Sequence, residues 1–336
     1  MSELLGGPIA VIGAGSWGTG LAWLLSHHGP AVRLWCRRPE LAAEIGRSAR
    51  NQVYLPSAVL PRWVTPTADL AEACAGAAMV VVAVPSVGMA AVAAQLAQVV
   101  APGTPVISAT KGLDHTTAQR MTVTLAAALG PEQPVAALSG PNLADEVVAG
   151  KPAVAVVAHG DCALRRALQA ALSRPLFRVY TNPDVAGVEL GGALKNPLAI
   201  AAGIVDGLGL GDNTKAALMT RGIHEVARLG VALGADERTF AGLCGFGDLL
   251  ATCHSRHSRN RSLGERLGRG ESVTAIQASS PEVVEGVPTT KTALRLAREQ
   301  GVEMPILTQL HAVIFEGLPI RAGVSALLAR DSIEEY

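Results

Sequence analysis

The chain has 336 residues, which is long enough for two domains and a sizeable core. Lys and Arg together number 28, as do Asp and Glu, and only 3% of residues are aromatic, so the sequence offers neither the basic field nor the stacking platforms of a nucleic-acid-binding protein. Five scattered cysteines without a Cys-x-x-Cys pair indicate free thiols rather than disulfides or a metal site, and the first residues lack the basic segment of a secretory signal. The sequence therefore predicts a cytoplasmic protein that binds neither nucleic acid nor a metal ion.

The N-terminal region contains a glycine-rich turn between a predicted strand and a predicted helix. An apolar run over residues 8–12 precedes Gly13-Ala-Gly-Ser-Trp-Gly, and a run of helical character over residues 19–25 follows it. Gly13 permits the tight turn, Gly15 lets the backbone approach a pyrophosphate, and Gly18 lets the helix pack closely on the strand. The N–H groups at the helix start can then face phosphate oxygens. This context favours dinucleotide binding over a structural glycine turn, which a chain with 36 glycines also produces by chance.

Predicted strands and helices alternate through the first half of the chain. Continuous apolar runs of this kind are typical of parallel strands covered on both faces. Further strands are predicted at residues 31–36, 78–84, 105–108, 135–138, 153–157 and 177–180, with helices at 39–49 and 69–75. The stretch around Pro56, Pro61 and Pro66 is predicted to be irregular. The pattern indicates an α/β fold, with a Rossmann-type doubly wound sheet over residues 1–183.

The second half of the chain has a different pattern. From about residue 184 the periodicity is helical, with glycine-rich connections and no convincing strand, which predicts an all-helical domain over residues 184–336. No membrane contact is expected, because prolines and glycines divide the charge-free stretch at residues 73–110 into pieces too short to span a bilayer.

Two polar clusters follow predicted strands of the sheet domain. Lys111 comes shortly after the strand at 105–108, where it can face a bound cofactor, although surface lysines are also common at strand ends. Asn142, in Ser139-Gly-Pro-Asn, follows the strand at 135–138 and is well suited to cap the helix that contains Ala144. A helix start at this edge of the sheet can also present N–H groups to an anion.

Three further clusters lie in the helical domain. Lys195 is surrounded by small and apolar residues, and desolvation there would lower its pKa towards a value useful for proton transfer. Asp248 stands in Gly245-Phe-Gly-Asp-Leu, and Arg259 in Ser258-Arg-Asn-Arg. Each of them alone could be a solvated helix residue, a turn residue or part of a basic face. Together they offer a proton donor, a carboxylate that orients it and a bidentate phosphate clamp, which suit a reductase of a small phosphorylated ketone.

Motifs along nearly the whole chain resemble those of one enzyme family. In order, they are the glycine-rich turn with Thr19, Ala109-Thr-Lys-Gly-Leu, Ser139-Gly-Pro, Phe177-Arg-Val-Tyr-Thr-Asn-Pro-Asp, Leu190-Gly-Gly-Ala-Leu-Lys-Asn, Gly245-Phe-Gly-Asp-Leu, Ser258-Arg-Asn-Arg, Val284-Glu-Gly and Gly301-Val-Glu-Met-Pro-Ile. By these motifs the sequence closely resembles the bacterial NAD(P)-dependent sn-glycerol-3-phosphate dehydrogenases. The resemblance implies a cytoplasmic, dimeric enzyme that reversibly reduces dihydroxyacetone phosphate to sn-glycerol 3-phosphate for glycerophospholipid synthesis.

The resemblance also implies roles for the residues that match these motifs. The residues implied to contact the cofactor, NADP or NAD, are Gly13, Gly15, Ser16, Trp17, Gly18, Arg37, Lys111, Ala144, Arg259, Val283 and Glu285. The residues implied to contact the substrate are Lys111, Gly140, Asn142, Lys195, Asp248, Ser258, Arg259 and Asn260, with Lys195 and Asp248 as the catalytic pair. Family members usually have Ser or Thr where this chain has Asn142, whose amide can donate as a hydroxyl can.

The choice between NADPH and NADH depends on the charged residues that follow the second predicted strand. The second predicted strand ends in Cys36-Arg37-Arg38, with no carboxylate to bind a ribose 2′-OH before Glu40, so NADPH should be accepted at least as well as NADH.

Two alternative functions share part of this pattern. A related dehydrogenase of a hydroxy acid or hydroxyacyl thioester would share the fold, but a clamp at Arg259 favours a small phosphate. A cofactor-sensing regulator would keep the glycine turn without needing the charged residues of the second domain.

Overall fold

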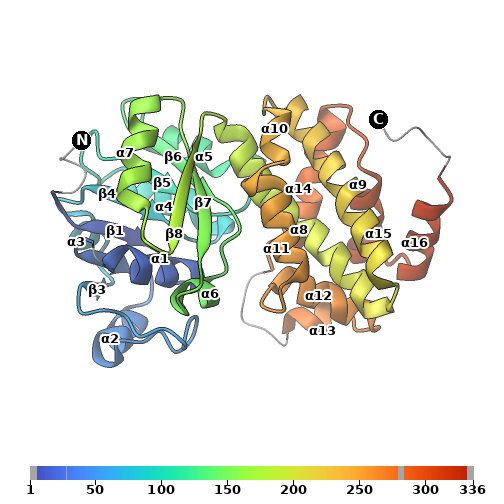
Figure 1. Ribbon diagram of the computed structural model, residues 1–336, viewed down its shortest axis with the longest axis horizontal. Coiled ribbons are helices and arrows are strands. Elements are labelled where there is room, and N and C mark those ends of the chain that lie inside the picture. Colours follow the sequence, from blue (N-terminus) through green and yellow to red (C-terminus); the bar gives the residue numbers. More distant parts are fainter. Residues whose placement is uncertain (1–5, 28, 279–283, 331–336) are drawn as a thin grey trace. The chain divides into compact units, whose positions relative to one another are not determined.

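The computed structural model describes residues 6–27, 29–278 and 284–330. The chain divides into two compact units, Met1–Glu189 and Leu190–Tyr336, and each is described by itself (Figure 1). The boundary predicted between residues 183 and 184 lies just before helix α8 (Val185–Leu208), whereas the division into units falls inside that helix. One continuous helix therefore contributes residues to both units.

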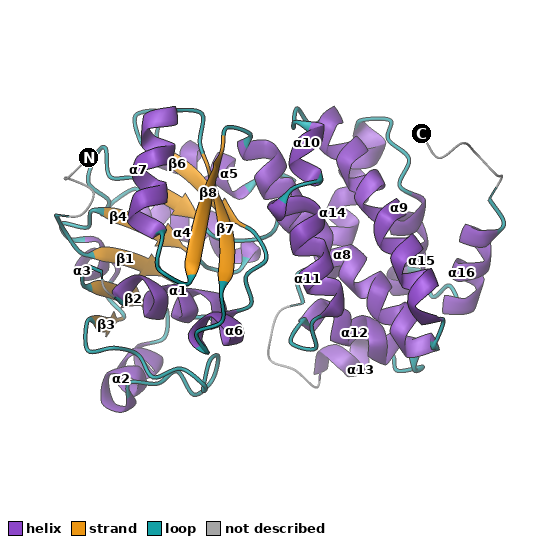
Figure 2. Ribbon diagram, viewed as in Figure 1, coloured by secondary structure: helices purple, strands orange, loops and turns teal. Residues whose placement is uncertain are grey.

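The first unit is built on one eight-stranded sheet with the strand order β3-β2-β1-β4-β5-β6-β7-β8 (Figure 2). The strands are β1 (Ile9–Ile12), β2 (Val32–Trp35), β3 (Val64–Thr67), β4 (Met79–Val82), β5 (Val106–Ser108), β6 (Val135–Ser139), β7 (Ala153–Ala158) and β8 (Phe177–Asn182). The connecting helices are α1 (Ser16–Ser26), α2 (Pro39–Ser48), α3 (Leu70–Cys74), η2 (Ser86–Gly88), α4 (Met89–Leu96), α5 (Met121–Leu129), α6 (Ala144–Val148) and α7 (Cys162–Leu172). Seven predicted strands and the predicted doubly wound α/β architecture are confirmed.

Strand β1 shows why such apolar runs form buried strands. Ile9 and Val11 belong to the core cluster that contains residues of α1, α2 and α7. Ala10 and Ile12 belong to the core cluster on the other face, with residues of α3, α4 and α5. Because successive side chains point to opposite faces and both faces are covered, every residue of the strand must be apolar.

The prediction of an irregular stretch around Pro66 is wrong at strand β3. This strand pairs in parallel with β2, with Pro66 opposite Leu34, and it is the edge of the sheet. The Val32 N–H donates to the Trp63 carbonyl and the Cys36 N–H to the Thr67 carbonyl, so the odd-numbered residues face β2 and Pro66 faces away. A proline is tolerated there because that position has no ladder hydrogen bond to donate.

The sheet also changes direction once. Strands β1 to β6 are parallel to their neighbours, but β7 runs antiparallel to β6, and β8 is parallel to β7. Only the five-residue helix α6 lies between β6 and β7. A parallel crossover ordinarily requires a longer connection that covers a face of the sheet, so the short segment fits a reversal of direction.

The second unit contains helices and no strand in its described residues, as predicted. Its core cluster joins α8 to four later helices, α12 (Arg259–Gly268), α13 (Val273–Ala278), α14 (Gly286–Glu299) and α15 (Pro305–Phe315), through residues such as Ile200, Leu263 and Leu310. By length and composition α8 could span a membrane, but the whole apolar window is buried in the protein, as in a core helix. After α8 the elements are α9 (Gly211–Ala232), α10 (Glu237–Phe240), η3 (Leu243–Gly247), α11 (Asp248–His254), α12 (Arg259–Gly268), α13 (Val273–Ala278), α14 (Gly286–Glu299), α15 (Pro305–Phe315) and α16 (Ile320–Leu328).

Candidate functional site

The glycine-rich turn lies between β1 and α1, at the carboxyl end of a central strand. Gly13 has a φ of 111°, and a Cβ there would lie 2.8 Å from the Ala83 carbonyl oxygen. A Cβ on Gly18 would lie 1.8 Å from the Gly13 carbonyl oxygen, so the helix can approach the turn only without one. In contrast, a Cβ on Gly15 would meet no atom within 4 Å. Two glycines are required by the fold, and the middle one keeps the space above the turn open.

The start of α1 has the features of a phosphate-binding helix end. Gly15 is the N-cap residue and supplies no side chain, while the first N–H bonded within the helix is that of Thr19, which donates to the Gly15 carbonyl. The N–H groups of the first helical turn are therefore available to an anion. The Ser16 hydroxyl donates to the Tyr54 carbonyl at 2.7 Å, and the half-buried Trp17 ring packs 6.5 Å from the Phe177 ring. Both side chains help to hold the turn in place.

Arg37 lies next to this turn. Strand β2 ends at Trp35, whose carbonyl accepts the Gly13 N–H at 3.1 Å, and Arg37 follows two residues later with an exposed side chain. Arg38 is the N-cap residue of α2, and its guanidinium lies 5.9 Å from the centre of the Tyr54 ring. An exposed guanidinium can pair with a 2′-phosphate or stack on an adenine face, and the cofactor contact implied for Arg37 stays a prediction.

Lys111 and Gly140 lie together at the ends of neighbouring strands. The Lys111 ammonium donates to the Gly140 carbonyl at 2.6 Å, and the lysine is half-buried. Gly140 has a φ of 129°, and a Cβ there would lie 3.1 Å from the Cα of Ala155. The lysine is therefore fixed by a backbone contact rather than being a mobile surface residue.

Asn142 does not cap the helix that follows it, so that prediction is wrong. The N-cap residue of α6 is Leu143, without a side-chain cap, and the Asn142 amide instead donates to the Val154 carbonyl at 2.7 Å. Asn142 lies one position too early in the chain to cap, and the adjacent start of β7 offers it a carbonyl. Its Oδ1 is buried and has no hydrogen-bond partner among the described residues. Ala144, the first residue of α6, faces Gly20 of α1, where a Cβ would lie 3.3 Å from its own Cβ.

In the second unit, Lys195 and Asp248 form a buried ion pair. The side chain of Lys195 is 8% exposed and that of Asp248 is 2% exposed, and the Lys195 ammonium contacts Asp248 Oδ1 directly. The ammonium also donates to the Thr252 hydroxyl at 2.7 Å, and that hydroxyl donates to the Asp248 carbonyl at 2.6 Å. Burial disfavours the ammonium form, whereas the carboxylate favours it. The predicted shift in the acidity of Lys195 stays a prediction.

Thr252 is absent from the residues that the sequence singled out. It lies one helical turn after Asp248 on α11, and side chains four residues apart share a helix face. That spacing is a signal in the sequence, but threonines are common in helices and only the contact with Lys195 distinguishes this one. It completes a three-residue cluster around the ammonium.

The predicted phosphate-binding residues lie at the start of α12. Ser258 is the N-cap residue, and its Oγ accepts the Arg261 N–H at 3.2 Å; a hydroxyl in this arrangement can still donate its own hydrogen. Arg259 is the first helical residue and its side chain is exposed. The Asn260 amide is buried, donates to Asn196 Oδ1 at 2.9 Å and accepts the Gly286 N–H at 2.9 Å. Asn260 therefore connects α12 to α8 and α14, a packing role that the motif did not reveal.

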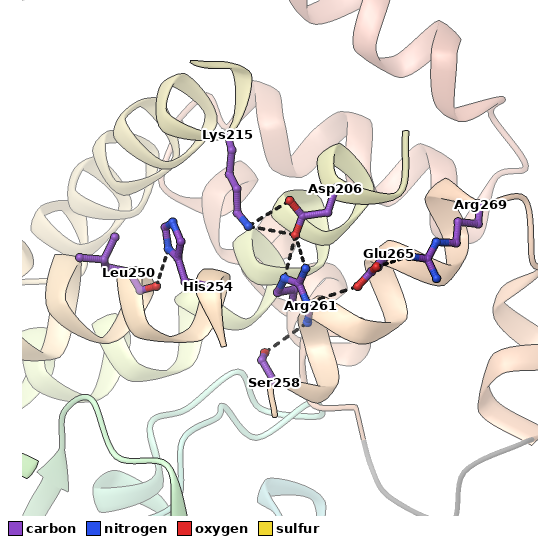
Figure 3. Close-up of polar contacts among 8 residues, drawn as sticks. All are labelled: Asp206, Lys215, Leu250, His254, Ser258, Arg261, Glu265 and Arg269. Carbon is purple, nitrogen blue, oxygen red and sulfur yellow. Dashed lines mark hydrogen bonds and ion pairs between the residues drawn. The ribbon is translucent and has the colours of Figure 1, made fainter. Parts of the chain in front are cut away.

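The last two residues implied to contact the cofactor, Val283 and Glu285, belong to the second unit. Glu285 is the N-cap residue of α14 and is half-buried, whereas Val283 lies outside the described residues. Arg261 is not part of a solvated basic face: its side chain is 15% exposed and contacts Asp206, as Figure 3 shows. The sequence pattern of cations around Arg259 thus contains both an exposed and a paired arginine.

Comparisons with known proteins agree over nearly the full chain. A family model for the NAD-dependent glycerol-3-phosphate dehydrogenase N-terminus matches residues 8–164, and the model for the C-terminus of the same family matches residues 184–325. Glycerol-3-phosphate dehydrogenase [NAD(P)+] of Moorella thermoacetica is 49% identical and that of Thermobifida fusca 46%, each covering 97% of this chain and 97% and 98% of those proteins. The crystal structure of glycerol-3-phosphate dehydrogenase from Coxiella burnetii has a TM-score of 0.92 at 38% identity, covering 96% of this chain and 99% of that one. The chain therefore belongs to the NAD-dependent glycerol-3-phosphate dehydrogenase family.

Proposed function

We propose that this chain reduces dihydroxyacetone phosphate to sn-glycerol 3-phosphate with NADPH or NADH, in a reversible reaction. The observation that carries the proposal is the buried Lys195 ammonium, which Asp248 and Thr252 hold in one orientation. A ketone reductase needs a group that gives a proton to the carbonyl oxygen as it becomes an alkoxide, and a fixed ammonium can do this. The names of the relatives support the same reaction.

The first unit fits a dinucleotide. The start of α1 offers unbonded N–H groups to a pyrophosphate, and the backbone at Gly15 leaves the approach open because a Cβ there would meet no protein atom within 4 Å. Arg37 would contact the adenosine end, and Lys111 would lie beside the reacting end of the cofactor. When bound, the reduced cofactor supplies the hydride.

In the second unit, Lys195 would hold the transferred proton at its Nζ. Two of its N–H groups contact Asp248 and Thr252, which fixes the direction of the ammonium before substrate binds. Asp248 would also stabilise the ammonium against the cost of burial. The Arg259 guanidinium and the N–H groups of the first turn of α12 would bind the substrate phosphate, with Ser258 adding a hydroxyl.

Three further properties belong to the same proposal. The sequence resemblance supports a homodimer, a cytoplasmic location and a product used for glycerophospholipid synthesis. Sedimentation of the purified protein tests the dimer directly, because a monomer would contradict that part of the proposal and leave the reaction untouched.

The reaction is tested by following nicotinamide absorbance with dihydroxyacetone phosphate and either NADPH or NADH. Oxidation of the cofactor, with sn-glycerol 3-phosphate as product, is the expected result. Turnover only with an unphosphorylated 2-keto acid would instead favour a hydroxy-acid dehydrogenase. Tight cofactor binding without turnover of any ketone would favour a cofactor-sensing regulator.

A further inference from the structure

A carboxylate outside the proposed catalytic cluster holds two cations in the second unit. Asp206 lies near the end of α8, and its two oxygens accept the Lys215 ammonium of α9 at 3.0 and 2.9 Å. The Nε and Nη2 of Arg261 both lie 2.7 Å from Oδ2 of the same carboxylate (Figure 3). The side chains of Lys215 and Arg261 are only 10% and 15% exposed, so neither cation is fully solvated. Neutralising Asp206 would remove the carboxylate that both cations share and leave Arg261 with Glu265 of its own helix, 3.2 Å from Nη1.

Arg261 links this carboxylate to the proposed phosphate site. Its backbone N–H donates to the Ser258 hydroxyl that begins α12, and it stands directly after Arg259 and Asn260 in the first turn of the helix. The first turn of α12 is therefore tied to α8 in two ways, by Arg261 through Asp206 and by Asn260 through Asn196. Asp206 itself is on the same helix as Lys195.

Helices α8 and α12 meet along a seam of glycines, defined by Gly203 and Gly207 on α8 and Gly264 and Gly268 on α12. A Cβ on Gly203 would lie 2.0 Å from the Arg261 carbonyl oxygen, and one on Gly264 would lie 1.9 Å from the Ile200 carbonyl oxygen. Backbone thus touches backbone, which sets the separation of the two helices. Beside this seam, side chains also join the two helices: Ile200 of α8 packs in one core cluster with Leu263 of α12, and the Asn260 amide donates to Asn196 Oδ1. The Asp206–Arg261 pair adds a charged contact between the same two helices.

We propose that Asp206 is a positioning residue for recognition of the substrate phosphate. This inference rests on the proposed function, because it assigns Asp206 the task of holding the phosphate-binding turn of α12 in register with the helix that carries Lys195. Two adjacent guanidinium nitrogens on one oxygen constrain direction as well as distance. Glu265 also contacts the Arg261 guanidinium, at 3.2 Å, so that Lys215 and Arg261 face two carboxylates and the cost of holding these charges away from water is reduced.

The test compares two ketones that differ only in the phosphate. In Asp206→Asn, kcat/KM for dihydroxyacetone phosphate should fall on the order of 10- to 100-fold, mainly through a higher KM, because small displacements of a binding group cost this much. For unphosphorylated dihydroxyacetone, measured at high enzyme concentration, kcat/KM should stay within about twofold, since it makes no use of the clamp. Glu271→Gln is the matched control, because it removes the Arg266–Glu271 ion pair near the other end of α12. It should leave kcat/KM unchanged for both ketones.

Three results would overturn the inference while leaving the proposed function intact. Equal losses for both ketones would mean that Asp206 only stabilises the fold, as would a lower kcat with an unchanged KM for the phosphorylated ketone. No loss with either ketone would mean that it positions nothing. If Asp206→Asn does not fold, Arg261→Lys carries the test: a single ammonium replaces two nitrogens, and it should raise the KM for the phosphorylated ketone alone. A wild-type protein that reduces neither ketone would contradict the proposed function instead.

Discussion

The two units place their polar groups by different means. The described part of the first unit buries one charged residue, Glu189 at its very end, and its proposed cofactor site consists largely of backbone groups beside glycines. The second unit buries Lys195, Lys215, Glu225 and Asp248. The proposed recognition of cofactor in the first unit therefore depends on where Cβ atoms are missing, and the proposed recognition of substrate in the second on which charges are paired. The two units should respond to different kinds of substitution.

Lys195→Ala is the sharpest test of the role given to paired charges in the second unit. It should lower kcat by roughly 10²- to 10⁴-fold, the range for losing a general acid, while the affinity for NADPH stays unchanged. Steady-state turnover and cofactor titration by fluorescence check the two parts. Lys291→Ala, at an exposed lysine of the same unit, is the control and should retain wild-type turnover. A Lys195 variant with nearly full turnover would contradict the proton-transfer role.

Glu225 tests what burial of a carboxylate costs when the hydrogen bonds that it accepts come from backbone N–H groups. Its carboxylate accepts the N–H groups of Ile306 and Leu307 at the start of α15, and burial raises its pKa to about 7. A folded-state pKa above the unfolded value gives stability that is complete below about pH 4.5 and lost as the pH rises through about 7. At about 1.4 kcal/mol per pKa unit, the loss amounts to about 3 kcal/mol.

Urea unfolding at pH 5 and pH 8 measures this loss. The wild type should lose more unfolding free energy between the two pH values than Glu225→Gln, in which nothing titrates at this position. Glu237→Gln, at an exposed carboxylate of the same unit, should keep the wild-type difference. Equal differences in wild type and Glu225→Gln would show that the buried carboxylate does not control the pH dependence.

For the first unit, two alanine substitutions in one turn should separate folding from binding. Gly18→Ala places a Cβ 1.8 Å from a backbone oxygen, so it should lower the unfolding free energy by about 1–3 kcal/mol, as overpacking does, and weaken cofactor binding with it. Gly15→Ala meets no protein atom and has an ordinary φ of −74°, so its Tm should not fall. Its affinity for NADPH should nevertheless drop about tenfold or more, about 1.4 kcal/mol, because the Cβ occupies the path of the pyrophosphate. Unchanged affinity in Gly15→Ala would place the pyrophosphate elsewhere.

Arg259→Lys tests whether the exposed cation of α12 acts by geometry as well as by charge. The KM for dihydroxyacetone phosphate should rise about tenfold, since an ammonium cannot bind phosphate through two parallel N–H groups. The exposed Arg256, changed to Lys, is the matched control and should leave KM unchanged. An unchanged KM in Arg259→Lys would move the clamp to another cation, with Lys111 the next candidate.

The smallest effect is expected for Arg37→Ala, which concerns the one charged side chain proposed for the adenosine end of the cofactor. A fall in kcat/KM with NADPH alone, of a few-fold, on the order of 1 kcal/mol, would indicate a contact with the 2′-phosphate. Equal falls with NADPH and NADH would indicate stacking on adenine. No fall with either cofactor would contradict any role of this arginine in binding.

The sequence predicted best what depends on neighbouring residues. The glycine turn, the apolar strands and the helical second unit are written in short windows of sequence, and all three are present. Strand β3 was missed because Pro66 is typical of loops, and only its place at the sheet edge makes a strand possible there. The wrong prediction for Asn142 has a similar origin, since the carbonyl that it contacts belongs to β7.

Long-range contacts explain the rest. Thr252 lies 57 residues from Lys195, and Asp206 lies 55 residues from Arg261, so no local pattern connects the partners. Family motifs identified Asn260 but not the partners of its amide on α8 and α14. A motif thus indicates which residues take part, whereas the fold decides which of them bind a ligand and which hold the others in place.

Pro66 on the outer side of β3 also affects how the sheet behaves towards other chains. An open sheet edge presents unpaired N–H and C=O groups that can recruit a strand from another molecule. Because Pro66 faces away from β2 and has no N–H, the outer side of this short strand lacks a donor at its centre. We therefore expect Pro66, which is typical of loops in a sequence, to disfavour edge-to-edge pairing of this strand with other chains.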